Sequence, residues 1–175
     1  ASYAYTDVAA IYELSFWAHF ELVSIHPWAD GNGRTCRLLM NLLQIEYGVL
    51  PTKVLREDKA EYIQALIDTR ENEDIQIFLD CMTQLHCKHL KWDIDQFIKS
   101  MAEEMVDKWS IKPALAKKLA DILIFADGKD EITTEIITKQ FNLTQTTAKR
   151  YLRQLTEFGY IEAQGGNKNR TYKKK

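Results

Sequence analysis

The sequence predicts a mainly α-helical protein of two domains, residues 1–112 and residues 113–175. Apolar residues recur at helical spacing through the first part. The second part begins at Pro113, and the residue before a proline is disfavoured in helical backbone. From Pro113 on, nine Lys and three Arg stand against three Asp and four Glu, although the whole chain carries a net charge of −2. This asymmetry favours two domains with different partners.

The first domain is expected to be entirely helical. Its amphipathic segments span residues 6–25, 33–47, 57–69, 74–91 and 93–109. Thr6 or Asp7 can cap the first helix. The second helix is apolar on nearly all sides, which predicts a central position, through Leu38, Leu39, Leu42, Leu43 and Ile45. The residues of the last helix that we expect to face inward are Ile94, Phe97, Ile98, Met101 and Met105.

The second domain combines helices with a short hairpin. Helices are expected over residues 113–126, 132–141 and 145–158. Two strand-like pieces follow within residues 160–175, around a Gly-Gly-Asn turn. Three helices followed by a hairpin are typical of a winged helix-turn-helix domain.

The composition is that of a globular protein, with 46% hydrophobic and 11% aromatic residues. No apolar run reaches the ~18 residues that cross a bilayer and no signal segment appears, so we expect a cytoplasmic protein without a membrane partner. Three cysteines match neither a secreted disulfide framework nor a paired zinc site. The chain starts at Ala1 without methionine and turns helical within a few residues, so we expect a fragment or processed form.

Residues 25–41, IHPWADGNGRTCRLLMN, group residues that suit a phosphate site. Gly31 and Gly33 let the backbone turn sharply and approach a ligand, and the helix that starts there directs its free N–H groups at the turn. This predicts a bound anion. Arg34 and Arg37 lie one turn apart and can hold further phosphate oxygens, and Asn41 extends the same stripe.

Two further side chains in this stretch add a metal ligand and a base. Asp30 precedes the loop and is suited to hold Mg²⁺ between phosphates. His26 is the nearby group that can accept a proton at neutral pH. These residues together predict a nucleoside triphosphate site with a metal and a general base. The Walker pattern GxxxxGK[ST] and the dinucleotide pattern GxGxxG are both absent.

The stretch HPWADGNGRTCR, from His26 to Arg37, resembles the Fic-family signature HPFx[DE]GNGRxxR, with Trp28 at the position of the usual Phe. A weaker resemblance continues through residues 61–82, so that it covers about residues 1–95. Fic proteins are all-helical and typically transfer AMP from ATP to a hydroxyl of a target protein. The intact GNGR favours AMP transfer over the phosphorylation or phosphocholine transfer of variant members.

The resemblance implies a role for each motif residue. His26 would deprotonate a Ser, Thr or Tyr hydroxyl of the target, or of the chain itself. Asp30 would hold Mg²⁺ on the α- and β-phosphates of ATP. The anion hole would consist of Gly31, Asn32 and Gly33. The β- and γ-phosphates would contact Arg34 and Arg37.

Two regulatory or positioning elements of Fic proteins are not found in the sequence. The inhibitory pattern [ST]xxxE[GN] does not occur, since Glu71 is followed by Asn but Ile67 stands where Ser or Thr is needed. The β-hairpin flap that aligns the target upstream of the motif is also not expected, because residues 1–25 read as one amphipathic helix. We therefore expect Mg-ATP binding here, with slow modification of targets.

The second domain carries a basic cluster. Its core stripe comprises Ala148, Tyr151, Leu152, Leu155 and Phe158. Cations outside that stripe or on the expected wing are Lys149, Arg150, Arg153, Lys168, Arg170 and Lys173. They would suit DNA phosphates, and the alternative is a solvated surface on a domain used for protein contacts or dimerisation.

Two rival interpretations stay open. The chain could be a transcriptional regulator whose Fic-like domain only senses nucleotide and is catalytically silent. A metal could bind Cys81, His86, Cys87 and His89, but on one helix these point in divergent directions without paired CxxC spacing. We expect His19 and Cys36 to be packing residues.

Overall fold

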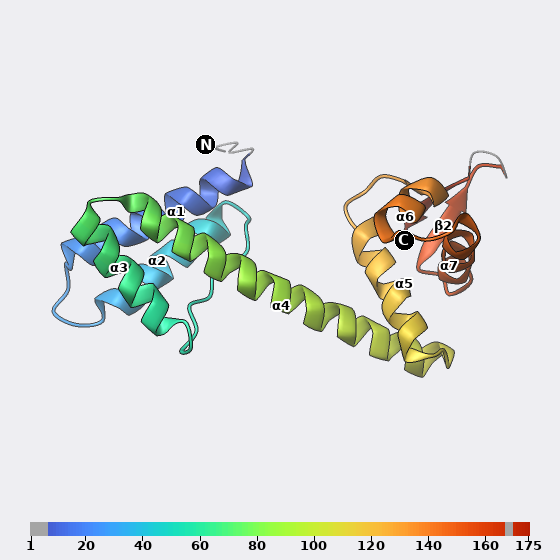
Figure 1. Cartoon of the computed structure of the whole chain (residues 1–175), viewed down its shortest axis with the longest axis horizontal. Helices are drawn as coiled ribbons and strands as arrows, with labels where there is room; N and C mark the ends of the chain where they lie inside the picture. Colours follow the sequence, from blue (N-terminus) through green and yellow to red (C-terminus); the bar gives the residue numbers. More distant parts are fainter. Residues whose placement is uncertain (1–6, 167–169) are drawn as a thin grey trace. The chain divides into compact units, whose positions relative to one another are not determined.

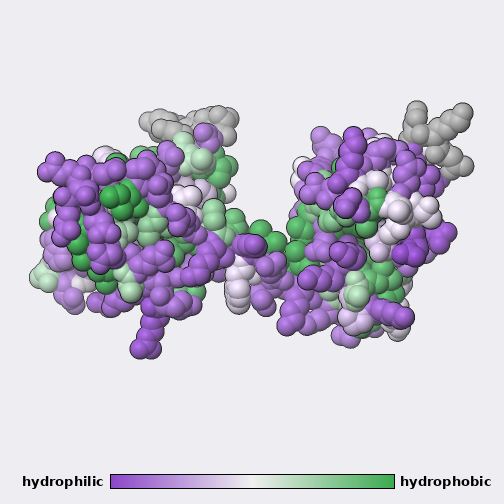
Figure 2. Space-filling model, in the orientation of Figure 1, coloured by the Kyte–Doolittle hydropathy of each residue, from purple (hydrophilic) through white to green (hydrophobic). Residues whose placement is uncertain are grey.

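The structure, a computed structural model, describes residues 7–166 and 170–175. The prediction of a mainly α-helical protein is confirmed, since this part of the chain forms seven helices and one small antiparallel sheet (Figure 1). The chain divides into two compact units, Ala1–Trp92 and Asp93–Lys175. Polar side chains cover most of the face of the C-terminal unit in Figure 2.

Three helices and the first part of a fourth make up the N-terminal unit: α1 (Val8–Ile25), α2 (Asn32–Glu46), α3 (Lys59–Asn72) and α4 (Ile75–Trp109). Asp7 caps α1, because its side chain accepts a hydrogen bond from the Ala9 N–H at 3.0 Å. Thr6 lies outside the described residues. The core of this unit is built around fully buried side chains, among them Phe16, Met40, Phe78, Met82 and Leu85.

α2 is not the central helix that its apolar sequence predicted. Leu38, Leu42 and Ile45 are 69%, 51% and 58% exposed. The residues that α2 buries recur every fourth position and include two polar side chains: Asn32, Cys36, Met40 and Gln44. The helix packs along one stripe only, and the leucines fall outside that stripe. The apolar residues on nearly all sides of α2 therefore did not predict which face of the helix is buried.

A polar network fastens the α2–α3 connection to the helices. The Gln44 amide donates to Ser15 Oγ at 2.8 Å and to Thr52 Oγ1 at 3.0 Å, while its oxygen accepts from the Thr52 N–H at 2.7 Å. Thr52 Oγ1 lies 3.1 Å from His86 Nδ1 on α4. Burial, with the neighbouring His89, lowers the pKa of His86. Because each buried polar group has a partner, the network can remain inside the unit.

Asp58, directly before α3, is the second anchor of this connection and is 1% exposed. Its carboxylate accepts hydrogen bonds from Lys88 Nζ at 2.7 Å, His89 Nε2 at 2.6 Å and the Leu55 N–H at 3.0 Å. His86 and His89 thus serve in two structural hydrogen-bond networks. No cluster of three His, Cys, Asp or Glu suited to a metal occurs in the part of the chain that the structure describes.

α1 corrects one expectation from composition. It is long and apolar enough by length and composition to cross a membrane, with a hydropathy of 1.2 over 18 residues. The prediction from the sequence considered continuous apolar runs, and scattered polar residues interrupt every such run in α1. The mean hydropathy over the helix is nevertheless high. In the structure, α1 buries Ile11, Phe16, His19 and Val23 within the N-terminal unit, and core helices of globular proteins meet the same criterion.

α4 is one helix of 35 residues where the sequence predicted two. Neither Gly nor Pro occurs between Lys91 and Asp93, so nothing interrupts the backbone hydrogen bonds there. The division between the units falls inside this helix, after Trp92, whereas we predicted it after residue 112. The reason is packing, because Ala102 and Met105 belong to the C-terminal core.

Two residues of α4 do not face inward as predicted. Ile94 and Phe97 are 42% and 58% exposed. Ile98 and Met101 are half-buried against the C-terminal core, and Met105 is fully buried in it. The inward face of this stretch therefore starts about one turn later than the sequence pattern indicated.

The rest of the C-terminal unit follows the predicted order of three helices and a hairpin: α5 (Pro113–Ala126), β1 (Ile132–Thr133), α6 (Thr134–Phe141), α7 (Gln145–Glu157), β2 (Ile161–Gln164) and β3 (Thr171–Lys174). The strands pair antiparallel in the order β1-β3-β2, with Tyr172 opposite both Ile132 and Ala163. β1 was not predicted, because two residues are too few for an alternating pattern.

Candidate functional site

His26 ends α1 in a left-handed backbone conformation, with φ 53° and ψ 55°. Its N–H donates to the Leu22 carbonyl at 3.2 Å, which closes the last turn of the helix. Residues other than glycine adopt this conformation seldom, although His, Asn and Asp do so more readily than most. The exposed His26 side chain therefore stands at a sharp change in chain direction, immediately before the glycine loop.

Asn32 holds the loop between α1 and α2 in shape. Its Oδ1 accepts a hydrogen bond from the Trp28 N–H at 2.9 Å, and its Nδ2 donates to the Trp28 carbonyl. The residue is 4% exposed, whereas Trp28 is 39% exposed. The Asn32 side chain thus organises the loop backbone. The sequence reading assigned Asn32 to the anion hole without this bracing role.

The N-terminus of α2 follows at once. Gly31 has φ 79°, a conformation that glycine adopts without steric cost. Its carbonyl accepts hydrogen bonds from the N–H groups of both Arg34 and Thr35 at 3.0 Å. The first N–H groups of a helix have no acceptor within it, and they carry the positive end of its dipole. This terminus is therefore chemically suited to an anion.

The two arginines of the motif have different surroundings. Arg34 is 78% exposed in its side chain, and its Nη2 lies 3.6 Å from Oδ2 of Asp30, itself 95% exposed. Arg37 is half-buried, with its Cζ 5.9 Å from the centre of the Tyr62 ring. A Cβ added at Gly33 would lie 3.4 Å from Arg37 Nη1. An alanine at position 33 would therefore meet the end of the Arg37 side chain at ordinary van der Waals distance.

Tyr62, whose ring contacts Arg37, is itself held by the buried residue His19. The Tyr62 hydroxyl lies 2.8 Å from His19 Nε2 in a buried hydrogen bond. Burial lowers the pKa of His19 to about 4, so this imidazole is neutral at pH 7. Burial also raises the pKa of Tyr62, against the opposing effect of Arg37. The sequence reading took His19 as a packing residue, which agrees with its full burial, but it did not find Tyr62.

Asn41 continues the arginine stripe one turn further along α2. Its Oδ1 is buried and has no hydrogen-bond partner within the described ranges. Cys36, between the two arginines, is fully buried, and burial raises the pKa of its thiol. Cys36 is therefore the packing residue that the sequence predicted.

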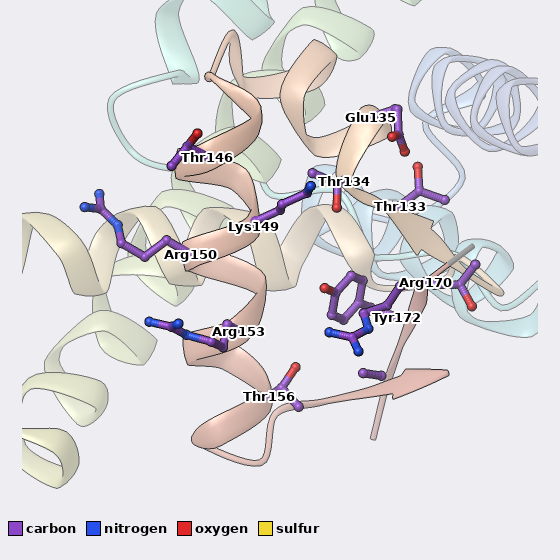
Figure 3. A pocket seen from close by; sticks show the side chains of 12 residues that line it. Thr133, Thr134, Glu135, Thr146, Lys149, Arg150, Arg153, Thr156, Arg170 and Tyr172 are labelled. Atoms are coloured by element: carbon purple, nitrogen blue, oxygen red, sulfur yellow. The ribbon is translucent and has the colours of Figure 1, made fainter. Parts of the chain in front are cut away.

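The cations of the C-terminal unit gather at a separate place. A pocket of about 1060 Å³ is lined by Lys149, Arg150, Arg153 and Arg170, among other residues (Figure 3). Lys168 lies outside the described residues. The structure thus brings together four of the six cations predicted for the basic cluster, and Lys173, on β3, is not part of the pocket lining.

Comparison with known proteins gives matches to the N-terminal part of the chain. Residues 1–44 match the Fic/DOC family. Over 84 residues the chain is 37% identical to "Protein adenylyltransferase fic-1" of Caenorhabditis briggsae, a stretch that covers 48% of this chain and 16% of that protein. Over 62 residues it is 44% identical to "Protein adenylyltransferase Fic" of Drosophila mojavensis, covering 35% of this chain and 12% of the fly protein.

A third relative gives the same picture. "Protein adenylyltransferase Fic" of Nematostella vectensis is 39% identical over 67 residues, which cover 38% of this chain and 16% of that protein. The chain thus spans no more than 16% of the length of these three relatives.

Proposed function

We propose that this chain carries the catalytic motif of a Fic-type protein adenylyltransferase, which transfers AMP from ATP to a hydroxyl of a target protein or of the chain itself. The observation that carries the proposal is the fold of residues 26–37. They form a braced turn that runs into the N-terminus of α2, with Arg34 and Arg37 on its first two turns. The similarity to proteins named as adenylyltransferases supports the same assignment.

The proposed reaction is a displacement at the α-phosphorus of ATP. The target hydroxyl oxygen forms a bond to that phosphorus, the bond to the oxygen bridging to the β-phosphate breaks, and pyrophosphate leaves. His26 accepts the hydroxyl proton. Main-chain N–H groups of Gly31 to Gly33 and the α2 dipole stabilise charge on the phosphate oxygens. Arg34 and Arg37 bind the β- and γ-phosphates.

Asp30 is the residue that would hold Mg²⁺. Its carboxylate is 95% exposed and paired only loosely with Arg34, so it is accessible to an ion that takes one or two carboxylates with phosphate oxygens and waters. Bound there, Mg²⁺ supplies positive charge that offsets the phosphate charge. We place this chemistry in the cytoplasm, since Cys36, Cys81 and Cys87 are free thiols, which suits a reducing compartment.

Intact-mass spectrometry after incubation with ATP and Mg²⁺ tests this proposal. The expected result is a protein mass increased by one AMP, on an added target or on the chain itself, and none with EDTA or with ADP. Transfer of a γ-phosphate instead would contradict the assignment.

The second candidate function is a nucleotide-sensing transcriptional regulator with a silent Fic-like domain. The observation that favours it is the basic pocket of the C-terminal unit. The two functions differ in one result, because the regulator binds ATP, as titration calorimetry would detect, without incorporating label from α-labelled ATP into protein.

Replacing Arg37 by Ala should weaken binding of ATP more than binding of ADP. We expect a loss of about ten- to a hundredfold for ATP, because a hydrogen bond to a charged group is worth about 1.5–3 kcal/mol and Arg34 remains. Titration calorimetry with both nucleotides measures the effect, and Arg70→Ala is the control, since Arg70 lies on α3 and donates to Ser24. Equal losses of affinity for ATP and ADP would show that Arg37 does not bind the γ-phosphate.

A further inference from the structure

We propose that the basic pocket of the C-terminal unit binds the phosphate backbone of duplex DNA, with α7 as the helix that enters the major groove. This inference does not depend on AMP transfer. It rests on the charge of the pocket, on the way α7 is held, and on the exposure of its cations.

The lining of the pocket is strongly positive. Four cations line it, Lys149, Arg150, Arg153 and Arg170, against one acid, Glu135. In Figure 3 Lys149, Arg150 and Arg153 come from α7, with Lys149 pointing toward the hairpin and the two arginines pointing to the other side of the helix, and Arg170 stands beside Tyr172. The whole chain has a net charge of −2, whereas residues 113–175 have twelve Lys and Arg against seven Asp and Glu, so the positive charge is confined to this part of the chain. A local positive surface of this kind attracts a polyanion.

Packing fixes which face of α7 is presented. Ala148, Leu152 and Leu155 are fully buried, which turns Lys149 and Arg153 outward, four residues apart along the helix. Thr144 caps the helix by accepting a hydrogen bond from the Thr147 N–H at 3.3 Å. The cations therefore stand on a rigid element, and little conformational entropy of the backbone is lost when they bind phosphates.

The ion pair of Arg153 is one that a DNA phosphate can replace. Arg153 lies 3.4 Å from Glu157, but both side chains are exposed, at 72% and 59%. Exposed pairs of this kind contribute little and are readily replaced by a phosphate. Arg150 extends over the Tyr151 ring, with its Cζ 5.2 Å from the ring centre. Threonine hydroxyls in the lining, such as that of Thr146, add donors of the type that contact DNA phosphates.

The geometry favours DNA over RNA. α6 and α7 are separated by three residues, with Asn142 in left-handed backbone, and a turn of this length joins the two helices of a helix-turn-helix. Such a motif places its second helix in the major groove of B-form DNA, which is about 12 Å wide. The deep, narrow major groove of A-form RNA does not admit a helix. A protein partner or a second copy of this chain is the competing occupant, and the experiment distinguishes them.

The test uses the full chain and a fluorescein-labelled random-sequence duplex of about 20 base pairs, followed by fluorescence anisotropy over a salt series. Binding is expected at low salt, with log affinity falling linearly with log salt as counterions are released. The variant Lys149→Ala/Arg153→Ala should have a slope shallower by about 1.8, since each lost phosphate contact removes about 0.9. Raising the salt from 50 to 200 mM lowers the affinity of both proteins for the duplex. The factor by which the affinity of the unmodified chain falls should be about ten times the factor for this variant.

The matched control removes two other exposed lysines. Lys117→Ala/Lys118→Ala changes the net charge by the same amount on α5, away from the pocket lining, and should keep the slope. Circular dichroism establishes that the variants fold, and the milder Lys149→Gln replaces any variant that does not. Equal effects of the two pairs, or no binding at low salt, would overturn the proposal. A duplex RNA bound as tightly as DNA, or a dimer that only the pocket variant dissociates, would overturn it as well.

Discussion

Replacing His26 by Asn is expected to lower the rate of AMP transfer by about 10²–10⁴-fold, the usual contribution of a general base. The affinity for Mg-ATP should not change, because the base acts on the target hydroxyl and the phosphates are held by residues from Asp30 onward. Asn is preferred to Ala here because it tolerates the left-handed backbone that His26 adopts, at φ 53°. Any loss of rate then reports the imidazole and not backbone strain.

Initial rates of AMP incorporation and titration calorimetry with Mg-ATP measure the two quantities separately. Ile25→Ala is the matched control, since Ile25 is the adjacent residue and its side chain is 68% exposed. A variant at His26 that binds ATP as weakly as it transfers AMP would place His26 among the phosphate contacts. If the His26→Asn variant transfers AMP at the rate of the unmodified chain, His26 is not the general base.

Replacing Asp58 by Asn is expected to lower the free energy of unfolding of the N-terminal unit by about 2–3 kcal/mol. The reason is that buried donors at His89 and Leu55 would lose a charged acceptor, and an unsatisfied buried group costs about 1–3 kcal/mol. Urea denaturation followed by circular dichroism measures the effect. Asp80→Asn is the control, because Asp80 accepts from Gln76 on the exposed side of α4. Equal small effects at both positions would show that Asp58 is not an anchor.

The contribution of Asp58 should depend on pH in a defined window. Burial raises its pKa, but the hydrogen bonds from Lys88, His89 and the Leu55 N–H outweigh burial and lower the pKa from 3.8 to about 2. Because the folded pKa lies below the unfolded one, the stabilisation is fully present above about pH 4 and is lost as the pH falls toward 2. The difference between the unmodified chain and Asp58→Asn should therefore shrink over this range, and a difference that grows would contradict it.

Local signals in the sequence predicted most of the helices. Asp7 is a cap whose effect is confined to the next turn, and it was found from the sequence. The exposed face of α2 was not predicted from the sequence, because the pattern of leucines does not show which stripe of the helix packs against α1. Gln44, which reaches Ser15 across 29 positions and Thr52 across eight, gives no local sign that it is buried.

The candidate site shows the same division. His26 to Arg37 are contiguous, so their grouping could be predicted from the sequence alone. The support of Arg37 by Tyr62 and His19 could not, since the Tyr62 hydroxyl and His19 Nε2 meet across 43 positions. The bracing of Trp28 by Asn32 spans only four residues, and an asparagine directly before the predicted helix of residues 33–47 was the signal that could have indicated it.

The anchoring of the α2–α3 connection has a consequence for amide hydrogen exchange. The N–H groups of Thr52 and Leu55 belong to an irregular segment, yet each donates to a buried side chain, of Gln44 and Asp58 respectively. Exchange of such protons requires the opening of the structure that holds the acceptor. These two amides should therefore exchange at rates close to those of the core helices, so that the connection opens together with the N-terminal unit.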